Sequence, residues 1–100
     1  MEKDDVFTEI VMDTKRIFES EIESIILSKS NDETDTATLY FFSGLIVQMK
    51  MVEGFLRLKF ESKKNIPYTE RMTNERKYFE EIINRALPYN GLNNNLKYTQ

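Results

Sequence analysis

TATLYFFSGLIVQMKMVEGFLRLKFES, residues 36–62, is the stretch on which the fold depends, because two structural periods fit it. Read with the period of a helix, it brings apolar side chains onto one face, namely Phe42, Leu45, Met49, Val52, Leu56 and Phe60. Charges alternate in sign along a second strip at steps of three and four residues, which is the spacing of helical ion pairs. The stretch is also rich in residue types that favour helix, such as Leu, Met, Gln and Lys. We therefore predict a long central helix over residues 37–62.

The same stretch also fits a meander of three strands, with turns at residues 43–44 (SG) and 53–54 (EG). Pairing across the second turn would match three apolar pairs on one face: Met51 with Leu56, Met49 with Leu58, and Val47 with Phe60. The other face would set Lys50 opposite Arg57, and like charges in that position reduce stability. Lys and Met are also weak strand formers. The meander is therefore the alternative, and the helix is preferred.

The residues before this stretch read as an amphipathic helix over 6–29. Its apolar stripe consists of Phe7, Ile10, Val11, Ile17, Phe18, Ile22, Ile25 and Ile26. Either Asp4 or Asp5 is a suitable N-cap for this helix. The polar run SKSNDETDT, residues 28–36, interrupts the stripe, so we expect the first loop there.

A third amphipathic helix is predicted over residues 69–87, where Pro88 should end it because proline lacks a backbone donor. The asparagine-rich tail, residues 88–100, is expected to be irregular. Forty per cent hydrophobic and 31% charged residues in a chain of this length predict one folded domain over 1–100. The expected fold class is all-α, a three-helix bundle whose long central helix is apolar on two sides. The alternative is α+β, in the order helix, three-stranded meander, helix.

Composition argues against an enzyme. The chain contains neither cysteine nor histidine, so thiolate nucleophiles, imidazole bases and the usual zinc ligands are all absent. No glycine-rich phosphate-binding motif is present either. We therefore predict no catalytic residues, no metal site and no cofactor.

Two acidic motifs have some features of a metal site, but neither is specific. Asp32, Glu33 and Asp35 cluster in the predicted loop, but they lack the glycine and the late glutamate of an EF-hand. The tripeptide at residues 61–63 (ESK) has the shape of a nuclease half-site, with Asp35 as its nearest metal partner. Such a tripeptide is very common by chance, and a helix over 37–62 would remove the arrangement.

The predicted central helix has a second apolar face, formed by Tyr40, Gly44, Val47, Met51, Gly54 and Leu58. A helix that is apolar on two sides is buried on two sides. We therefore expect a protein-interaction domain, acting as an adaptor, inhibitor or assembly subunit. It would bind a protein partner, most simply a second copy, through this face of the central helix.

Nucleic-acid binding is the alternative function. Residues 1–35 contain eleven acidic and four basic residues, whereas residues 36–100 contain six acidic and ten basic ones. Under the meander, a basic face would include Lys50, Arg57, Lys59, Lys63 and Lys64. An isoelectric point near 5.0 argues against this function, because phosphate contacts usually require a strongly basic domain.

No membrane association is expected, since the longest apolar stretch falls short of the roughly 20 residues that span a bilayer. The absence of cysteine and of a signal-peptide pattern at the start predicts a cytoplasmic protein. The asparagine- and lysine-rich composition is typical of an AT-rich genome, such as that of a low-GC bacterium or its phage.

Overall fold

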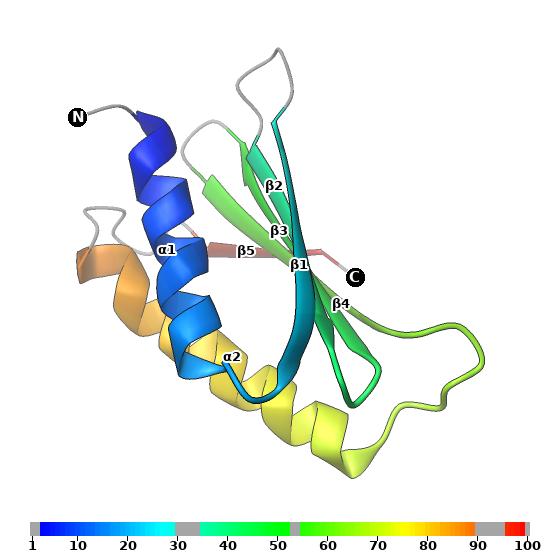
Figure 1. The fold of residues 1–100 in the computed structure, drawn as a ribbon. Coiled ribbons are helices and arrows are strands. Elements are labelled where there is room, and N and C mark those ends of the chain that lie inside the picture. Colours follow the sequence, from blue (N-terminus) through cyan, green and yellow to red (C-terminus); the bar gives the residue numbers. More distant parts are fainter. Residues whose placement is uncertain (1–2, 30–34, 53–54, 90–95, 100) are drawn as a thin grey trace.

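The computed structural model describes residues 3–29, 35–52, 55–89 and 96–99, which contain two helices and five strands (Figure 1). In chain order the elements are α1 (Lys3–Ile17), β1 (Ile22–Lys29), β2 (Asp35–Phe41), β3 (Leu45–Val52), β4 (Phe55–Ser62), α2 (Glu70–Tyr89) and β5 (Leu96–Thr99). The strands form one sheet in the order β1-β2-β3-β4-β5. The first four are antiparallel neighbours, and β5 lies parallel to β4.

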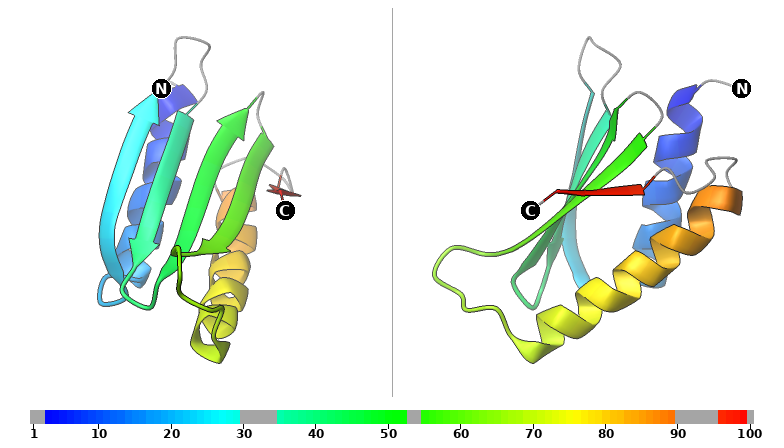
Figure 2. Two further views of the ribbon diagram at one scale, coloured as in Figure 1. Left: turned by 90° about the vertical axis from the view of Figure 1, so that its right-hand side faces the viewer. Right: turned by 180° about the vertical axis from the view of Figure 1, so that it is seen from behind.

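Both helices lie on the same side of the sheet, so the molecule has two layers (Figure 2). The helices run behind the strands in the left view of Figure 2, and the opposite face of the sheet is turned toward the viewer with no helix over it. We refer to these as the covered face and the open face. Only the covered face can belong to the hydrophobic core.

The predicted three-helix bundle is wrong, because residues 37–62 form strands and turns. Along β2, buried and half-buried positions alternate without a break from Asp35 to Phe41, which is the period of a strand with one face in the core. The sheet prevails because neighbouring strands satisfy the backbone of each strand while its apolar face is buried.

The α+β alternative is closer to the structure, although the meander contains four antiparallel strands instead of three. The β3–β4 pairing has the register inferred from the sequence, including Lys50 opposite Arg57. The turn between β2 and β3 contains Gly44, whose φ of +102° favours glycine. Residues 53–54, the other predicted turn, lie outside the described residues.

The helix predicted over 6–29 ends at Ile17, and its second half is strand β1. A tight turn follows the helix, in which the amides of Glu21 and Ile22 both donate to the carbonyl oxygen of Phe18, at 2.9 and 3.0 Å. The isoleucines of β1 are spaced as on a helix, but β-branched residues also favour strands, and pairing with β2 decides between the two. Residues 28–29 and 35–36 of the predicted loop belong to β1 and β2, and the rest of that loop lies outside the described residues.

The third predicted helix is confirmed as α2, with small differences at its ends. Thr69 caps it, because the Met72 amide donates to the Thr69 hydroxyl oxygen at 3.2 Å. The helix runs through Pro88 to Tyr89, so proline does not end it where expected. The predicted irregular tail is wrong at residues 96–99, which form β5.

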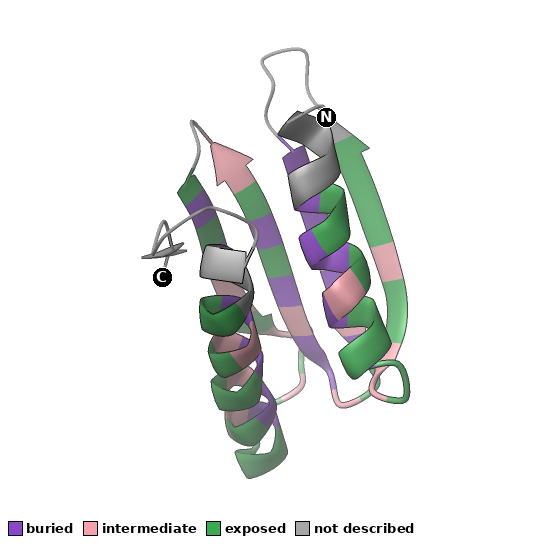
Figure 3. Cartoon of the chain, turned by 90° about the vertical axis from the view of Figure 1, so that its left-hand side faces the viewer, coloured by how far each residue is buried: buried purple, intermediate pink, exposed green. Residues whose placement is uncertain are grey.

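The core lies between the helices and the covered face (Figure 3). Its buried members from the sheet are Ala37, Leu39, Phe41, Leu45, Val47, Met49, Leu56 and Leu58. The helical layer contributes Phe7, Ile10, Val11, Phe18, Met72, Phe79 and Ile83. These side chains explain why each strand buries one face only.

Aromatic rings join the two layers at the centre of the core. The Phe79 ring of α2 lies 5.5 Å from that of Phe18, 6.4 Å from Phe41 and 5.9 Å from Phe60, measured between ring centroids. These partners belong to the turn directly after α1, to β2 and to β4. Phe79 is therefore the side chain that ties α2 to both of the other parts of the fold, and such ring pairs add to the stability gained by burial.

Candidate functional site

The open face of the sheet is the face that neither α1 nor α2 covers (Figure 2). Strand alternation places on it Ser24, Ile26, Ser28, Thr36, Thr38, Tyr40, Ile46, Gln48, Lys50, Val52, Phe55, Arg57, Lys59 and Glu61. None of these side chains is fully buried. The face combines hydroxyl, β-branched, aromatic and basic groups, whereas the covered face is almost wholly apolar.

Three basic residues, Lys50, Arg57 and Lys59, gather on two neighbouring strands of the open face, and we call them the basic cluster. Lys50 of β3 is directly opposite Arg57 of β4, and Lys59 follows Arg57 by two residues on the same side. Side chains directly opposite on one face have Cβ atoms about 5 Å apart. The cluster is therefore a compact site of positive charge on a surface that neither α1 nor α2 covers.

The basic cluster lacks the acidic partners that the helical arginines have. Four arginines on the helices are paired within one turn: Arg16 with Asp13, Arg71 with Glu75, Arg76 with Glu80, and Arg85 with Glu81. The Arg76 bond to Glu80, at 2.9 Å, also raises the pKa of Arg76. Among the side chains that the structure describes, none forms an ion pair with Lys50, Arg57 or Lys59. Their charge is thus available to an anionic ligand.

Two aromatic side chains flank the basic cluster along the open face. Phe55, which is 39% exposed, precedes Arg57 by two residues on β4. Tyr40 lies on β2 opposite Ile46, which is in turn opposite Glu61. Successive rows on one face of a strand are about 7 Å apart. The order along the face is therefore an aromatic row, two basic rows, and a row with a second aromatic ring.

The structure separates Lys63 and Lys64 from the other predicted basic residues. The Lys63 amide donates to the carbonyl oxygen of Gly44 at 2.7 Å, so Lys63 lies beside the β2–β3 turn. The row of Lys50 and Arg57 lies toward the opposite end of the sheet. Of the five basic residues predicted for nucleic-acid binding, three come together and two do not.

Five of the six residues predicted for partner binding are described by the structure, and they share no surface because residues 37–62 do not form the helix that would have aligned them. Val47 and Leu58 are completely buried in the core, and Met51 points to the covered face beside them. Gly44 is buried in the β2–β3 turn, and Tyr40 lies on the open face. Gly54 lies outside the described residues. Tyr40 is thus the one member of the set that the structure places on the open face.

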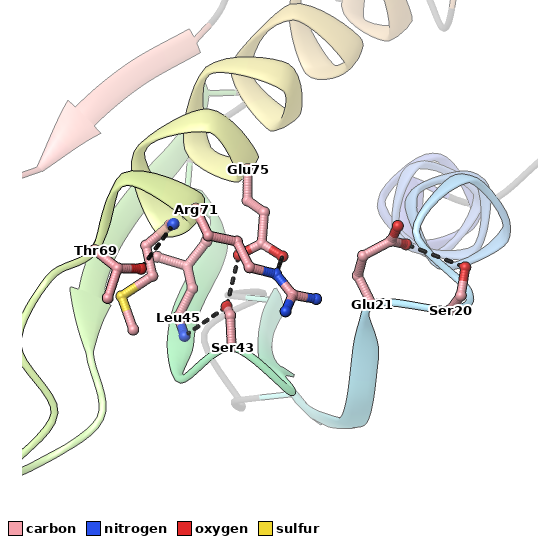
Figure 4. A network of polar contacts seen from close by, with 8 residues as sticks. Ser20, Glu21, Ser43, Leu45, Thr69, Arg71 and Glu75 are labelled. Atoms are coloured by element: carbon pink, nitrogen blue, oxygen red, sulfur yellow. Dashed lines mark hydrogen bonds and ion pairs between the residues drawn. The ribbon is translucent and has the colours of Figure 1, made fainter.

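A polar network unforeseen from the sequence links the β2–β3 turn to α2 (Figure 4). The Ser43 hydroxyl donates to Glu75 Oε1 at 2.6 Å and accepts from the Leu45 amide at 3.4 Å. Glu75 is 9% exposed, and its Oε2 accepts no hydrogen bond, although Arg71 Nε lies 3.7 Å away. The evident role of the Ser43–Glu75 pair is to fix the turn on the helix.

Of the acidic motifs with features of a metal site, the structure describes Asp35 and Glu61, and it does not bring these two together. Asp35 faces the covered side at the start of β2, whereas Glu61 lies on the open face near the end of β4. Along the strands they are separated by five residues, roughly 17 Å. Within the described ranges no three acidic side chains gather in a way that could hold a metal ion. Asp32 and Glu33 lie outside those ranges.

Neither helix, within the residues described, is both long and apolar enough to cross a membrane. Comparisons with protein-family models, with curated proteins and with solved structures find no match to this chain.

Proposed function

We propose that this protein is a non-enzymatic binding domain that holds single-stranded nucleic acid on the open face of its sheet. The observation that carries the proposal is the basic cluster, in which Lys50 and Arg57 face each other without an acidic partner among the described side chains. Phosphate groups are the natural ligands for such a pair, because each cation can donate to a phosphate oxygen.

The unfavourable pairing itself supports a binding role. Like charges directly opposite on a sheet reduce folding stability, and a neutral or acidic residue at position 50 or 57 would relieve the repulsion. An anion bound between the two side chains would relieve it as well. Sites where a local rule of folding is broken are where function is expected.

A single strand fits this surface better than a duplex does. Exposed bases can stack on aromatic side chains such as Tyr40 and Phe55, while the phosphates between them meet the basic cluster. A duplex reader instead requires a helix or ribbon that enters a groove. Here both helices lie on the covered face, and their arginines are already paired with acidic residues.

The low isoelectric point is compatible with this proposal because charge is unevenly distributed. The described open face has three basic residues and one acidic residue, Glu61. Local positive charge next to stacking surfaces governs binding to a single strand, and net repulsion from the remainder of the chain is screened beyond about 8–10 Å at ordinary salt.

Fluorescence anisotropy with labelled single-stranded RNA and DNA oligonucleotides tests the proposal. We expect binding that weakens with salt, and at least about tenfold weaker binding by Arg57→Glu or Lys50→Glu. Lys59→Gln should lower the slope of log affinity against log salt by about 0.7, the value for one lost phosphate contact on a single strand.

Lys77→Glu is the matched control, because Lys77 is exposed on α2 and undergoes the same change in charge away from the open face. It should bind like the unchanged protein. Absence of binding at low salt, or equal losses in Lys77→Glu and Arg57→Glu, would contradict the proposal. Binding of polyglutamate in place of nucleic acid, with the same dependence on Arg57, would overturn it in favour of an acidic protein ligand.

A further inference from the structure

Strand β1 has one edge with no partner among the residues that the structure describes. Its inner edge pairs with β2 from Ile22 to Lys29, and it is the first strand in the sheet order. At the other side of the sheet, the edge of β4 is paired with β5. A free edge carries a row of backbone donors and acceptors, and these readily pair with another strand.

The centre of β1 lacks the devices that usually protect an edge. Ser24, Ile25, Ile26, Leu27 and Ser28 contain no charge and no proline. Ile26 is 57% exposed on the open face, and Leu27 is 53% exposed on the other side of the strand. The bulge between Ile22 and Ser24 lies at one end and leaves the centre of the strand regular.

The sequence of β1 is complementary to itself in one antiparallel register. Centred on Ile26, a second copy would place Ile26 opposite Ile26, Ile25 opposite Leu27, and Ser24 opposite Ser28. A shift of two residues in either direction would break these matches, because it would set Ile26 opposite Ser24 or opposite Ser28. The matching of apolar side chains therefore selects this register.

We infer that two copies of this chain form a dimer by antiparallel pairing of their β1 strands about a two-fold axis at Ile26. The axis is perpendicular to the sheet, so the helices of both copies lie on one side and the two open faces join on the other. The four-stranded meanders then become one continuous antiparallel sheet. Each copy supplies the partner that the β1 edge of the other lacks.

The dimer would place two basic clusters on one surface. Five strand spacings separate β3 of one copy from β3 of the other, which is roughly 24 Å across the sheet. The dimer does not depend on the proposed nucleic-acid binding, and it is tested with no nucleic acid present. Its failure and the failure of the binding proposal are therefore separate results.

Light scattering coupled to size exclusion tests the dimer over a dilution series. The unchanged protein should show twice the 11.9 kDa of one chain. Ile26→Lys should give a folded monomer, because two lysines would meet at the axis. Mixing Ile26→Lys with Ile26→Glu should restore the dimer, since position 26 faces its own copy. Gln48→Lys, exposed on the same open face but on β3, should remain dimeric.

A cysteine scan tests the register even where a charged variant fails to fold. The chain has no cysteine, so an added one forms a disulfide only with a second copy. Residues opposite each other in antiparallel strands have Cα atoms about 4.5–5.5 Å apart, within the range that a disulfide spans. Ile26→Cys should cross-link under mild oxidation, whereas Gln48→Cys should not. A single-chain mass at every concentration, a dimeric Ile26→Lys, or equal cross-linking of both cysteine variants would overturn the inference.

Discussion

The two faces of the sheet are made from alternate residues of the same strands, but they follow different rules. On β4, Leu58 is fully buried against the helices, whereas Arg57 and Lys59 on either side of it point to the open face. The covered face is apolar and joined to α2 through Phe79. The open face retains a like-charge pair that weakens the fold. The comparison indicates that the covered face determines stability, whereas the open face contributes little to the core.

The largest expected effect comes from neighbouring residues of β4 on opposite faces. Leu58→Ala should lower the free energy of unfolding by about 2–5 kcal/mol, because it leaves a cavity in the core. Lys59→Ala should change it by less than about 0.5 kcal/mol. Urea unfolding followed by circular dichroism measures both. Similar losses for the two variants would show that the open face is itself packed against something.

A smaller effect is expected where the sheet meets the start of α2. Gly44→Ala should lower the free energy of unfolding by about 1–3 kcal/mol, because alanine rarely adopts a φ of +102°. The new Cβ would also lie 3.0 Å from Met72 Cε, closer than side chains normally approach. Thermal unfolding tests this expectation. An unchanged melting temperature would mean that the turn adapts without moving α2.

Ser43→Ala should cost less, about 1–2 kcal/mol. It removes the hydrogen bond to Glu75 and leaves a second oxygen of a buried carboxylate without a donor. The double variant Ser43→Ala with Glu75→Gln should cost less than the two single changes together, because the two side chains interact directly. Strict additivity in urea unfolding would contradict a role of this pair in joining the layers.

The smallest expected effect is a gain in stability, whereas most substitutions lower stability. Arg57→Glu turns the repulsion with Lys50 into attraction, so the free energy of unfolding should rise by about 0.5–1 kcal/mol while nucleic-acid binding falls. The gain should shrink at high salt, which screens exposed charges. Denaturant titrations at two salt concentrations test both statements. A loss of stability would show that Arg57 has a favourable partner in the fold.

The strand pairing within residues 36–62 can be predicted from the sequence. The sequence does not show, however, that these residues form strands instead of a helix. The turn residues and the apolar pairs define the β3–β4 register completely, down to Lys50 opposite Arg57. The repulsion between Lys50 and Arg57 lowers the stability of the meander and therefore argues against it. Burial of the covered face of β3 and β4 stabilises the meander by more, since Val47, Met49, Leu56 and Leu58 are all fully buried.

The other differences arise from contacts between distant residues. Nothing local in residues 22–29 distinguishes a helical stripe from a strand, and the pairing with β2 settles it. Ser43 and Glu75 are 32 residues apart, so no local pattern announces their hydrogen bond. The basic cluster can be predicted from the sequence only if the meander is assumed, because the β3–β4 register is what brings its residues together. Helix α2 is predictable because its stripe and its cap lie within one segment.

The parallel strand β5 has a consequence for local opening of the protein. Antiparallel neighbours in the meander are joined by short connections, but Leu56 of β4 pairs with Leu96 across the whole of α2. Closing the chain over the length of α2 costs conformational entropy, and β5 has only four residues with which to form backbone hydrogen bonds. We therefore expect the backbone amides of β5 to exchange with solvent hydrogen well before those of β3. Because Arg57 and Lys59 lie on β4 beside β5, release of β5 would expose the outer backbone edge of the strand that carries them.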